Sequence, residues 1–132
     1  MTGSEIAGIY VHDTPATPYA VDIAAGRKPI ETRTRDVLGR FLGEKVLIIR
    51  TRSGHQADVV GYGTIAEKRF YTAAELDAIR DKTLIPKGSK YDCTGGGKWG
   101  YTIKDQVLFS KPIPLSAYTV TRKTRSFAML TV

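Results

Sequence analysis

A predicted helix is joined to a predicted strand by the segment Gly26-Arg27-Lys28-Pro29-Ile30-Glu31-Thr32-Arg33. Before it, Tyr19 and Ile23 have the four-residue spacing of one helix face, and a glycine often follows the end of a helix. These features predict a short helix near residues 18–25. From residue 30 to residue 35, isoleucine or threonine alternates with a charged side chain, which is the period of a β-strand.

The charged side chains of this predicted strand share one face. Residues two apart in a strand point the same way, so Glu31, Arg33 and Arg35 are expected to lie together, with Lys28 beside them at the junction. Such a patch could hold a phosphate through its arginines and a base edge through its glutamate. The alternative is a ladder of salt bridges on a solvated face. As exposed polar residues, Lys28 and Arg33 are expected to contribute little to stability.

The rest of the chain predicts more strand than helix. Strands are expected at residues 6–11, 45–52, 59–70, 101–109 and 118–131. Gly61 and Gly63 predict a β-bulge or a close approach of two backbones. Thr72 and Glu75 have the spacing of a capping box and predict a helix over residues 73–80. Together these elements predict an α+β fold, a small β-barrel flanked by two or three short helices, in a single domain spanning residues 1–132.

The charge of the chain favours a partner that carries phosphate. Its 132 residues include 20 Lys and Arg against 13 Asp and Glu, a formal net charge of +7. The basic residues are concentrated in residues 27–52, 87–111 and the C-terminal tail. A basic surface of this kind attracts nucleic acids and nucleotides, while a merely solvated surface is the alternative.

Several classes of protein do not fit the composition. No apolar run approaches the roughly 20 residues of a membrane span, and the N-terminus lacks the pattern of a signal peptide. The single cysteine, Cys93, cannot form an internal disulfide, which predicts a cytoplasmic protein. With only His12 and His55 besides, no metal site and no cofactor are expected. The sequence indicates neither a membrane partner nor an oligomeric state.

Aromatic residues supply a second candidate feature. Trp99 and Tyr101, with Tyr62, Tyr71 and Tyr91, could act as stacking platforms for an unstacked base. The alternative is that Trp99 and Tyr101 fill the core. The run Gly-Gly-Gly-Lys at residues 95–98 lacks the spacing of a phosphate-binding P-loop and is interpreted as a loop before a strand.

The pattern Gly-Arg-Lys-x-x-Glu-x-Arg at residues 26–33 resembles the signature of the ASCH domain, a branch of the PUA-like superfamily. Further stretches resemble the family in the same order. Residues 43–49 and 59–65 are similar to ASCH strands, and residues 99–105, 112–115 and 121–129 are similar to stretches of small phage- and prophage-type members. The resemblance covers most of residues 6–132, and it implies a PUA-like barrel.

The resemblance also implies a module that binds RNA, single-stranded nucleic acid or a nucleotide. The ligand would lie in a cleft between the first helix, residues 28–33 and residues 99–101. In that cleft the cations would neutralise phosphate, Glu31 would accept a hydrogen bond from a base or sugar, and an aromatic ring would stack. The expected ligand-binding residues are Lys28, Glu31, Arg33, Arg35, Trp99 and Tyr101.

Two other functions stay open. ASCH proteins include ribonucleases and hydrolases of acylated cytidine nucleosides, the latter with a Lys-x-x-Thr pair. Here Glu31 occupies the threonine position, and the neighbouring Thr32 is expected to point to the other face. In an enzyme of this kind, Lys28 would be the general base or electrostatic stabiliser and Glu31 the proton shuttle. The third possibility is a protein-interaction module whose basic face meets an acidic partner.

Overall fold

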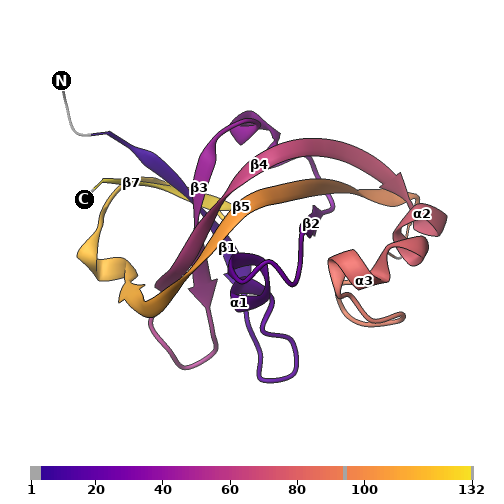
Figure 1. Cartoon of the computed structure of the whole chain (residues 1–132), viewed down its shortest axis with the longest axis horizontal. Helices are drawn as coiled ribbons and strands as arrows, with labels where there is room; N and C mark the ends of the chain where they lie inside the picture. The colour runs from indigo at the N-terminus through magenta and orange to yellow at the C-terminus, as the bar shows by residue number, and fades with distance from the viewer. Residues whose placement is uncertain (1–3, 94, 132) are drawn as a thin grey trace.

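Two long antiparallel strands span the molecule. In the computed structural model, which describes residues 4–93 and 95–131, β4 (Asp58–Thr72) and β5 (Gly97–Pro114) pair along most of their length. They arch side by side from one end of the molecule to the other, where α2 (Ala73–Ala78) follows β4 (Figure 1). This arch carries the other elements beneath it.

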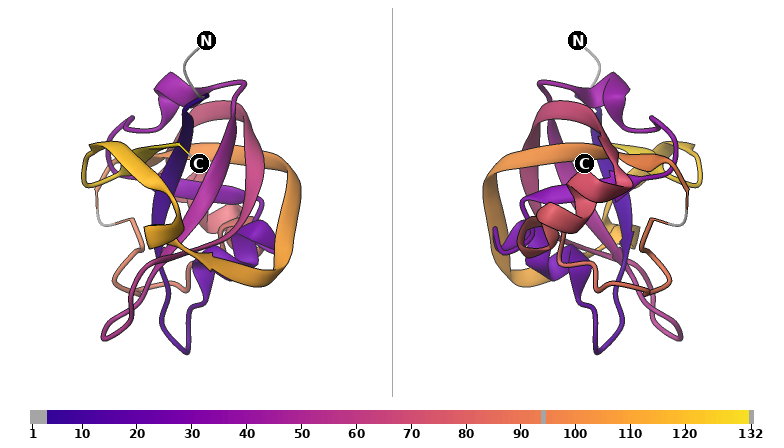
Figure 2. Two further views of the ribbon diagram at one scale, coloured as in Figure 1. Left: turned by 90° about the vertical axis from the view of Figure 1, so that its left-hand side faces the viewer. Right: turned by 90° about the vertical axis from the view of Figure 1, so that its right-hand side faces the viewer.

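Five shorter strands complete a seven-stranded sheet in the order β2-β5-β4-β3-β1-β7-β6. They are β1 (Ile6–His12), β2 (Ile30–Arg33), β3 (Lys45–Thr51), β6 (Thr119–Lys123) and β7 (Phe127–Thr131). The pairing of β1 with β3 is parallel, and the other pairings are antiparallel. Seen from the side, the sheet is strongly curved (Figure 2).

The sheet is not closed into a barrel, so the prediction of a barrel is wrong in this respect. Its two edges are β2 and β6, which are not paired with each other in the described part of the chain. Strand β2 has only four residues, and β7 pairs with β1 only as far as Ile9. The last residues of β1 therefore face β2 without a ladder between them. A side chain crosses this gap, where Arg33 Nη2 donates to the main-chain oxygen of Tyr10 at 2.6 Å.

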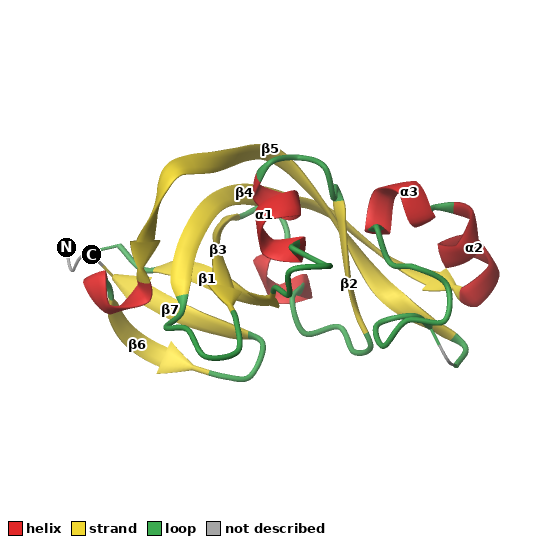
Figure 3. Ribbon diagram, turned by 90° about the horizontal axis from the view of Figure 1, so that it is seen from below, coloured by secondary structure: helices red, strands yellow, loops and turns green. Residues whose placement is uncertain are grey.

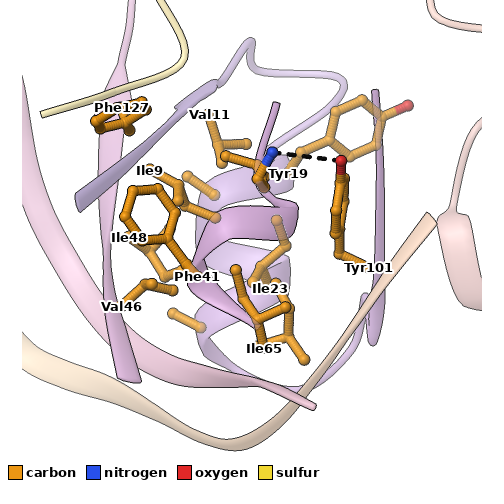
Figure 4. Packing of buried hydrophobic residues seen from close by; sticks show 14 of the residues in the cluster. Ile9, Val11, Tyr19, Ile23, Phe41, Val46, Ile48, Ile65, Tyr101 and Phe127 are labelled. Atoms are coloured by element: carbon orange, nitrogen blue, oxygen red, sulfur yellow. Dashed lines mark hydrogen bonds between the residues drawn. The ribbon is translucent and has the colours of Figure 1, made fainter. Parts of the chain in front are cut away.

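Helix α1 (Tyr19–Ala24) covers the concave side of the sheet and forms the core with it. Its inward residue Ile23 packs in one cluster with Ile9, Ile48 and Ile65, all fully buried (Figure 4). A smaller cluster on the opposite side of the sheet includes Ile49. None of the helices in the described part of the chain is both long and apolar enough to span a membrane.

Both predicted helices are present, with small differences. The helix predicted near residues 18–25 is α1. The capping box is confirmed, since Glu75 N donates to Thr72 Oγ1 at 3.2 Å and Thr72 N donates to Glu75 Oε1 at 3.0 Å. The second helix breaks at Ile79, after which α3 (Arg80–Thr83) continues to Leu84, whose φ is +59°. The two 3-10 turns are η1 (Gly39–Phe41) and η2 (Leu115–Ala117).

The strand predictions hold in position but not in length. The ladder between β4 and β5 shifts register at Gly61, where a Cβ would lie 2.0 Å from the main-chain oxygen of Val107. The predicted bulge is therefore confirmed. Strand β2 ends at Arg33 rather than at residue 35, and β5 is far longer than residues 101–109. The single strand predicted over residues 118–131 is a hairpin, because Thr124 Oγ1 accepts hydrogen bonds from Ser126 N and Phe127 N in a turn.

Candidate functional site

A cavity of about 240 Å³ opens at the gap between β1 and β2. Figure 3 shows β2 between α1 on one side and α3 on the other. The walls of this cavity, named the Lys28 cavity, come from β1, α1, β2 and the segment after α3. The lining residues are Tyr10, Val11, His12, Tyr19, Lys28, Glu31, Thr32, Arg33, Ile85, Tyr91 and Lys98.

Lys28 is the most buried cation of the site. It is only 1% exposed, and its ammonium donates a hydrogen bond to the main-chain oxygen of Thr83. The same Nζ lies 3.6 Å from Glu31 Oε1 and 4.9 Å from the centre of the Tyr19 ring. Burial lowers the pKa of Lys28, although the nearby Glu31 charge opposes this shift. The expectation that Lys28 is an exposed side chain is therefore wrong.

Glu31 connects Lys28 to Arg33. Its Oε2 accepts hydrogen bonds from Arg33 Nε at 3.2 Å and from Arg33 Nη2 at 3.0 Å, and its Oε1 accepts one from Thr32 N. Burial alone would raise the pKa of Glu31, but the charges of Arg33 and Lys28 outweigh burial, so the pKa is lowered. Glu31 is thus held as a carboxylate between two cations. The predicted grouping of these three residues is present.

Three tyrosines line the cavity, and two of them, Tyr19 and Tyr91, are in contact. Tyr19 begins α1, and Tyr91 lies in the segment before β5. Their rings meet edge to face with centres 6.0 Å apart. Tyr19 is buried and its hydroxyl donates to the main-chain oxygen of Leu84 at 3.2 Å, whereas Tyr91 is half-buried. Of this pair, Tyr91 therefore offers the accessible ring, and the half-buried Tyr10 is the third tyrosine of the lining.

Tyr101 is a core residue, which corrects its prediction as a stacking platform. Its side chain is fully buried, and its hydroxyl donates to Asp36 Oδ1 at 2.7 Å. The same hydroxyl accepts a hydrogen bond from Leu38 N at 3.3 Å (Figure 4). Burial raises the pKa of Tyr101 to about 12. Because neither face of the ring is free, Tyr101 cannot stack on a ligand here.

Trp99 and Arg35 also lie away from the lining of the Lys28 cavity. Trp99 packs edge to face against Phe70, with ring centres 5.6 Å apart, and Lys68 Nζ lies 5.5 Å from its ring. Arg35 is exposed in the bend after β2, because the strand ends two residues earlier. A strand continuing through residue 35 was the basis for placing Arg35 on the same face as Glu31.

Several lining residues were not predicted from the sequence. Lys98 donates a hydrogen bond to the main-chain oxygen of Tyr91 and so fixes the segment that carries this ring. The sequence feature that could have indicated Lys98 is its position directly after the glycine run. Thr32 also borders the cavity, because the cavity follows the free side of the edge strand β2.

The site contains cations and aromatic rings rather than a cluster of metal ligands. Within residues 4–93 and 95–131, no group of three or more His, Cys, Asp and Glu residues could hold a metal ion. What the arrangement can do chemically is bind an anion beside a flat or polar group. Arg33 and Lys98 supply accessible charge, and Tyr91 supplies a ring face.

The architecture, a curved open sheet with a helix on its concave side and a cationic cavity at the unpaired edge, places the chain in a known fold class. An ASCH protein from Zymomonas mobilis has a solved structure that covers 83% of this chain and 74% of its own, with 19% identity and a TM-score of 0.65. A serine-to-alanine variant from the same organism covers 91% of this chain and 85% of its own, with 18% identity and a TM-score of 0.68. The chain therefore has an ASCH-type fold, as its sequence resemblance predicts. No family model matches the sequence, and no curated protein matches it.

Proposed function

We propose that the protein binds single-stranded nucleic acid, RNA above all, with one nucleotide in the Lys28 cavity. The observation that carries the proposal is the cationic cluster in a cavity with an aromatic wall. Lys28, Arg33 and Lys98 outnumber the one carboxylate among the lining residues, Glu31. Proteins that bind single strands combine such charge with stacking rings. The formal net charge of +7 favours the same class of ligand.

Within the cavity the charged side chains have different roles. Three hydrogen bonds to Glu31 come from Thr32 and Arg33, which fills most of the roughly four acceptor positions of a carboxylate. We therefore assign Glu31 to holding the two cations in place rather than to reading a base. Arg33 is partly exposed and keeps further N–H groups for a phosphate oxygen. Lys98 is half-buried at the rim and adds a second accessible charge.

Fluorescence anisotropy with a labelled single-stranded RNA, measured at several salt concentrations, tests the proposal. The variants are Lys28→Met, which keeps the volume of the buried side chain, and Lys98→Ala. The matched control is Lys111→Ala, which removes one exposed positive charge from β5 outside the cavity. We expect the two cavity variants to weaken binding and the control to leave it nearly unchanged.

Folding of each variant is checked by circular dichroism before its affinity is compared. Equal affinities of the cavity variants and the Lys111→Ala control would contradict the proposal. Failure of free nucleotides to compete with the RNA would indicate that the cavity is not the site. Binding of an acidic protein that nucleotides cannot displace would favour the interaction module instead.

A second function, hydrolysis of the same class of ligand, is favoured by one observation. Burial lowers the pKa of Lys28, which brings a lysine closer to the range of a general base. Glu31, with its Oε1 at 3.6 Å, could relay the proton. Incubation with short RNAs and with acylated cytidine, beside a Lys28→Met variant, tests this function. Turnover by the wild type that is lost in the variant would establish it, and no turnover would leave binding alone.

A further inference from the structure

Two neighbouring cavities at the end of β1 share lining residues with the Lys28 cavity. A cavity of about 420 Å³, named the Arg52 cavity, lies between the end of β1, α1 and the loop after β3. Another of about 410 Å³, named the Arg125 cavity, lies beside the turn between β6 and β7. His12 lines all three cavities, and Tyr10 lines both the Lys28 cavity and the Arg125 cavity. The three spaces therefore meet at one residue.

The central cavity is too small for a whole ligand. Its volume of about 240 Å³ lies below the roughly 300–1,000 Å³ of cavities that enclose a complete small molecule. A base or a sugar with its phosphate could enter, while the rest of the ligand would continue into the neighbouring cavities. The flanking cavities are larger and more open, which suits backbone that stays partly solvated.

The Arg52 cavity retains a hydrogen-bond donor without a partner. Arg50 is held by Asp58 through two hydrogen bonds of 2.9 and 2.6 Å, so most of its charge is neutralised. Arg52 lies farther from the same carboxylate, at 3.7 Å, and its buried Nε has no hydrogen-bond partner in the described part of the chain. The other carboxylate, Asp13, is buried, and burial raises its pKa. Because the Arg52 side chain is partly exposed and lies farther from Asp58 than Arg50 does, its outer N–H groups are available to a phosphate.

The Arg125 cavity carries unneutralised positive charge. Lys123 and Arg125 are both exposed, and neither forms an ion pair within residues 4–93 and 95–131. No acidic residue lines this cavity among the described residues. The turn that presents them is fixed by the side-chain hydrogen bonds of Thr124. Positive charge is therefore present in both neighbouring cavities.

We infer that the ligand is an oligonucleotide strand that crosses all three cavities past His12, and not a free nucleotide. This inference rests on the proposed function, since the central nucleotide occupies the Lys28 cavity. The preceding and following nucleotides lie in the Arg52 and Arg125 cavities, with their phosphates near Arg52, Lys123 and Arg125. Along this path, successive phosphates of the strand lie near successive positive side chains of the protein. Proteins that bind single strands contact the nucleic-acid backbone through positively charged grooves of this kind.

A length series separates this inference from the proposed function. Competition binding is measured with a mononucleotide, a trinucleotide and a pentanucleotide of the same base. We expect affinity to rise at least tenfold from the mononucleotide to the trinucleotide, because the flanking phosphates add contacts. A mononucleotide that binds as tightly as the longer strands would overturn the strand path while leaving the proposed function intact. Absence of binding at every length would overturn both.

Two variants locate the flanking contacts. Arg52→Ala and the double variant Lys123→Ala/Arg125→Ala are expected to bind the mononucleotide like the wild type but to lose most of the gain with length. In the salt dependence, each lost phosphate contact should lower the slope by about 0.7. The matched control is Lys104→Ala/Lys111→Ala, which removes two exposed charges of β5 that line none of the three cavities. If the Arg52 variant and the Lys123/Arg125 double variant show the same gain in affinity with length and the same salt slope as this control, the proposed strand path is overturned.

Discussion

Lys28 Nζ lies 3.6 Å from Glu31 Oε1, and both side chains are buried at the unpaired edge of the sheet. Arg33 holds the other oxygen of the same carboxylate and also reaches the main chain of β1. Two cations therefore share one anion, which leaves an excess of positive charge inside the Lys28 cavity. The same contacts hold β2 against β1 where no backbone ladder joins them.

Replacing Glu31 with glutamine is expected to destabilise the fold. The change removes the only anion between Lys28 and Arg33, and breaking a buried ion pair from one side costs about 3–5 kcal/mol. Urea unfolding followed by circular dichroism measures this loss. Glu67→Gln, at an exposed position of β4, is the matched control and should change stability very little. An equal effect of the two variants would show that the buried cluster does not support the fold.

The same glutamine variant should change how stability depends on pH. The pKa of Lys28 is lowered in the folded protein from its ordinary value of 10.5. In the pH interval just below 10.5, the unfolded chain therefore binds more protons than the folded protein does. Stability therefore rises with pH over that interval. Without the Glu31 charge, which raises the pKa of Lys28, the interval widens toward lower pH. Unfolding measured between neutral and alkaline pH should show a steeper rise for Glu31→Gln than for wild type, and parallel curves would contradict this account.

Tyr101→Phe is expected to lower stability without affecting the site. The substitution removes the hydroxyl that donates to Asp36 and accepts from Leu38 N, leaving a buried N–H unpaired at a cost of about 1–3 kcal/mol. RNA affinity of the folded protein should stay unchanged. Tyr118→Phe is the control, since that hydroxyl makes no hydrogen bond within the described residues. If the Tyr101→Phe variant were fully folded and still lost RNA binding, Tyr101 would take part in binding after all.

Features that depend on neighbouring residues could be predicted from the sequence. The capping box of Thr72 and Glu75 forms within one helical turn. Gly61 indicates a bulge in its own strand, whichever strand pairs with it. The grouping of Lys28 with Glu31 and Arg33 is equally local, because it depends on one helix-to-strand junction. Each of these predictions needed only the period and the residue types of a short segment.

Burial could not be predicted, because it is decided by segments far apart in the chain. Lys28 is covered by Thr83, 55 residues away, and Tyr101 reaches Leu38 across 63 residues. The alternation that predicts a strand does not say which face becomes the core. For the same reason Tyr101 was expected in the cleft, while the tyrosines that line the cavity are Tyr10, Tyr19 and Tyr91. The open edge likewise follows from the short length of β2, which the alternating pattern overestimated by two residues.

Gly61→Ala is expected to disturb the pairing of β4 with β5. A Cβ at this position would lie 2.0 Å from the main-chain oxygen of Val107 and 2.9 Å from Ala24 Cβ, so backbone must move. Overpacking of this kind costs about 1–3 kcal/mol, which thermal unfolding would register as a drop of several degrees. Gly95→Ala is the control, since an added methyl there meets nothing within 4 Å. Equal melting temperatures for the two variants would contradict the close approach.

The segment that carries Tyr91 into the cavity depends on its neighbour Asp92. This carboxylate accepts hydrogen bonds from Gly88 N at 2.7 Å and Cys93 N at 2.9 Å, and from the Arg80 guanidinium at 3.2 and 3.3 Å. The hydrogen bond from Gly88, followed by that from Arg80, lowers the pKa of Asp92 to about 2. The loop after α3 is thus fixed by an ionised group, and its order should depend on pH.

Acid should loosen this loop through Asp92. Because the folded pKa is about 2 and the ordinary value is 3.8, the contribution of Asp92 is complete above about pH 4 and is lost as pH falls toward 2. The protection of the amides of residues 87–93 against hydrogen exchange, corrected for the intrinsic pH dependence of exchange, should therefore fall over that interval. In Asp92→Asn the exchange should already be fast at neutral pH and change less with acid, because the amide keeps one acceptor and loses the charge pairing with Arg80. Asp81→Asn, at an exposed position of α3, should follow the wild type. If Asp92→Asn also followed the wild-type curve, another group would hold the loop.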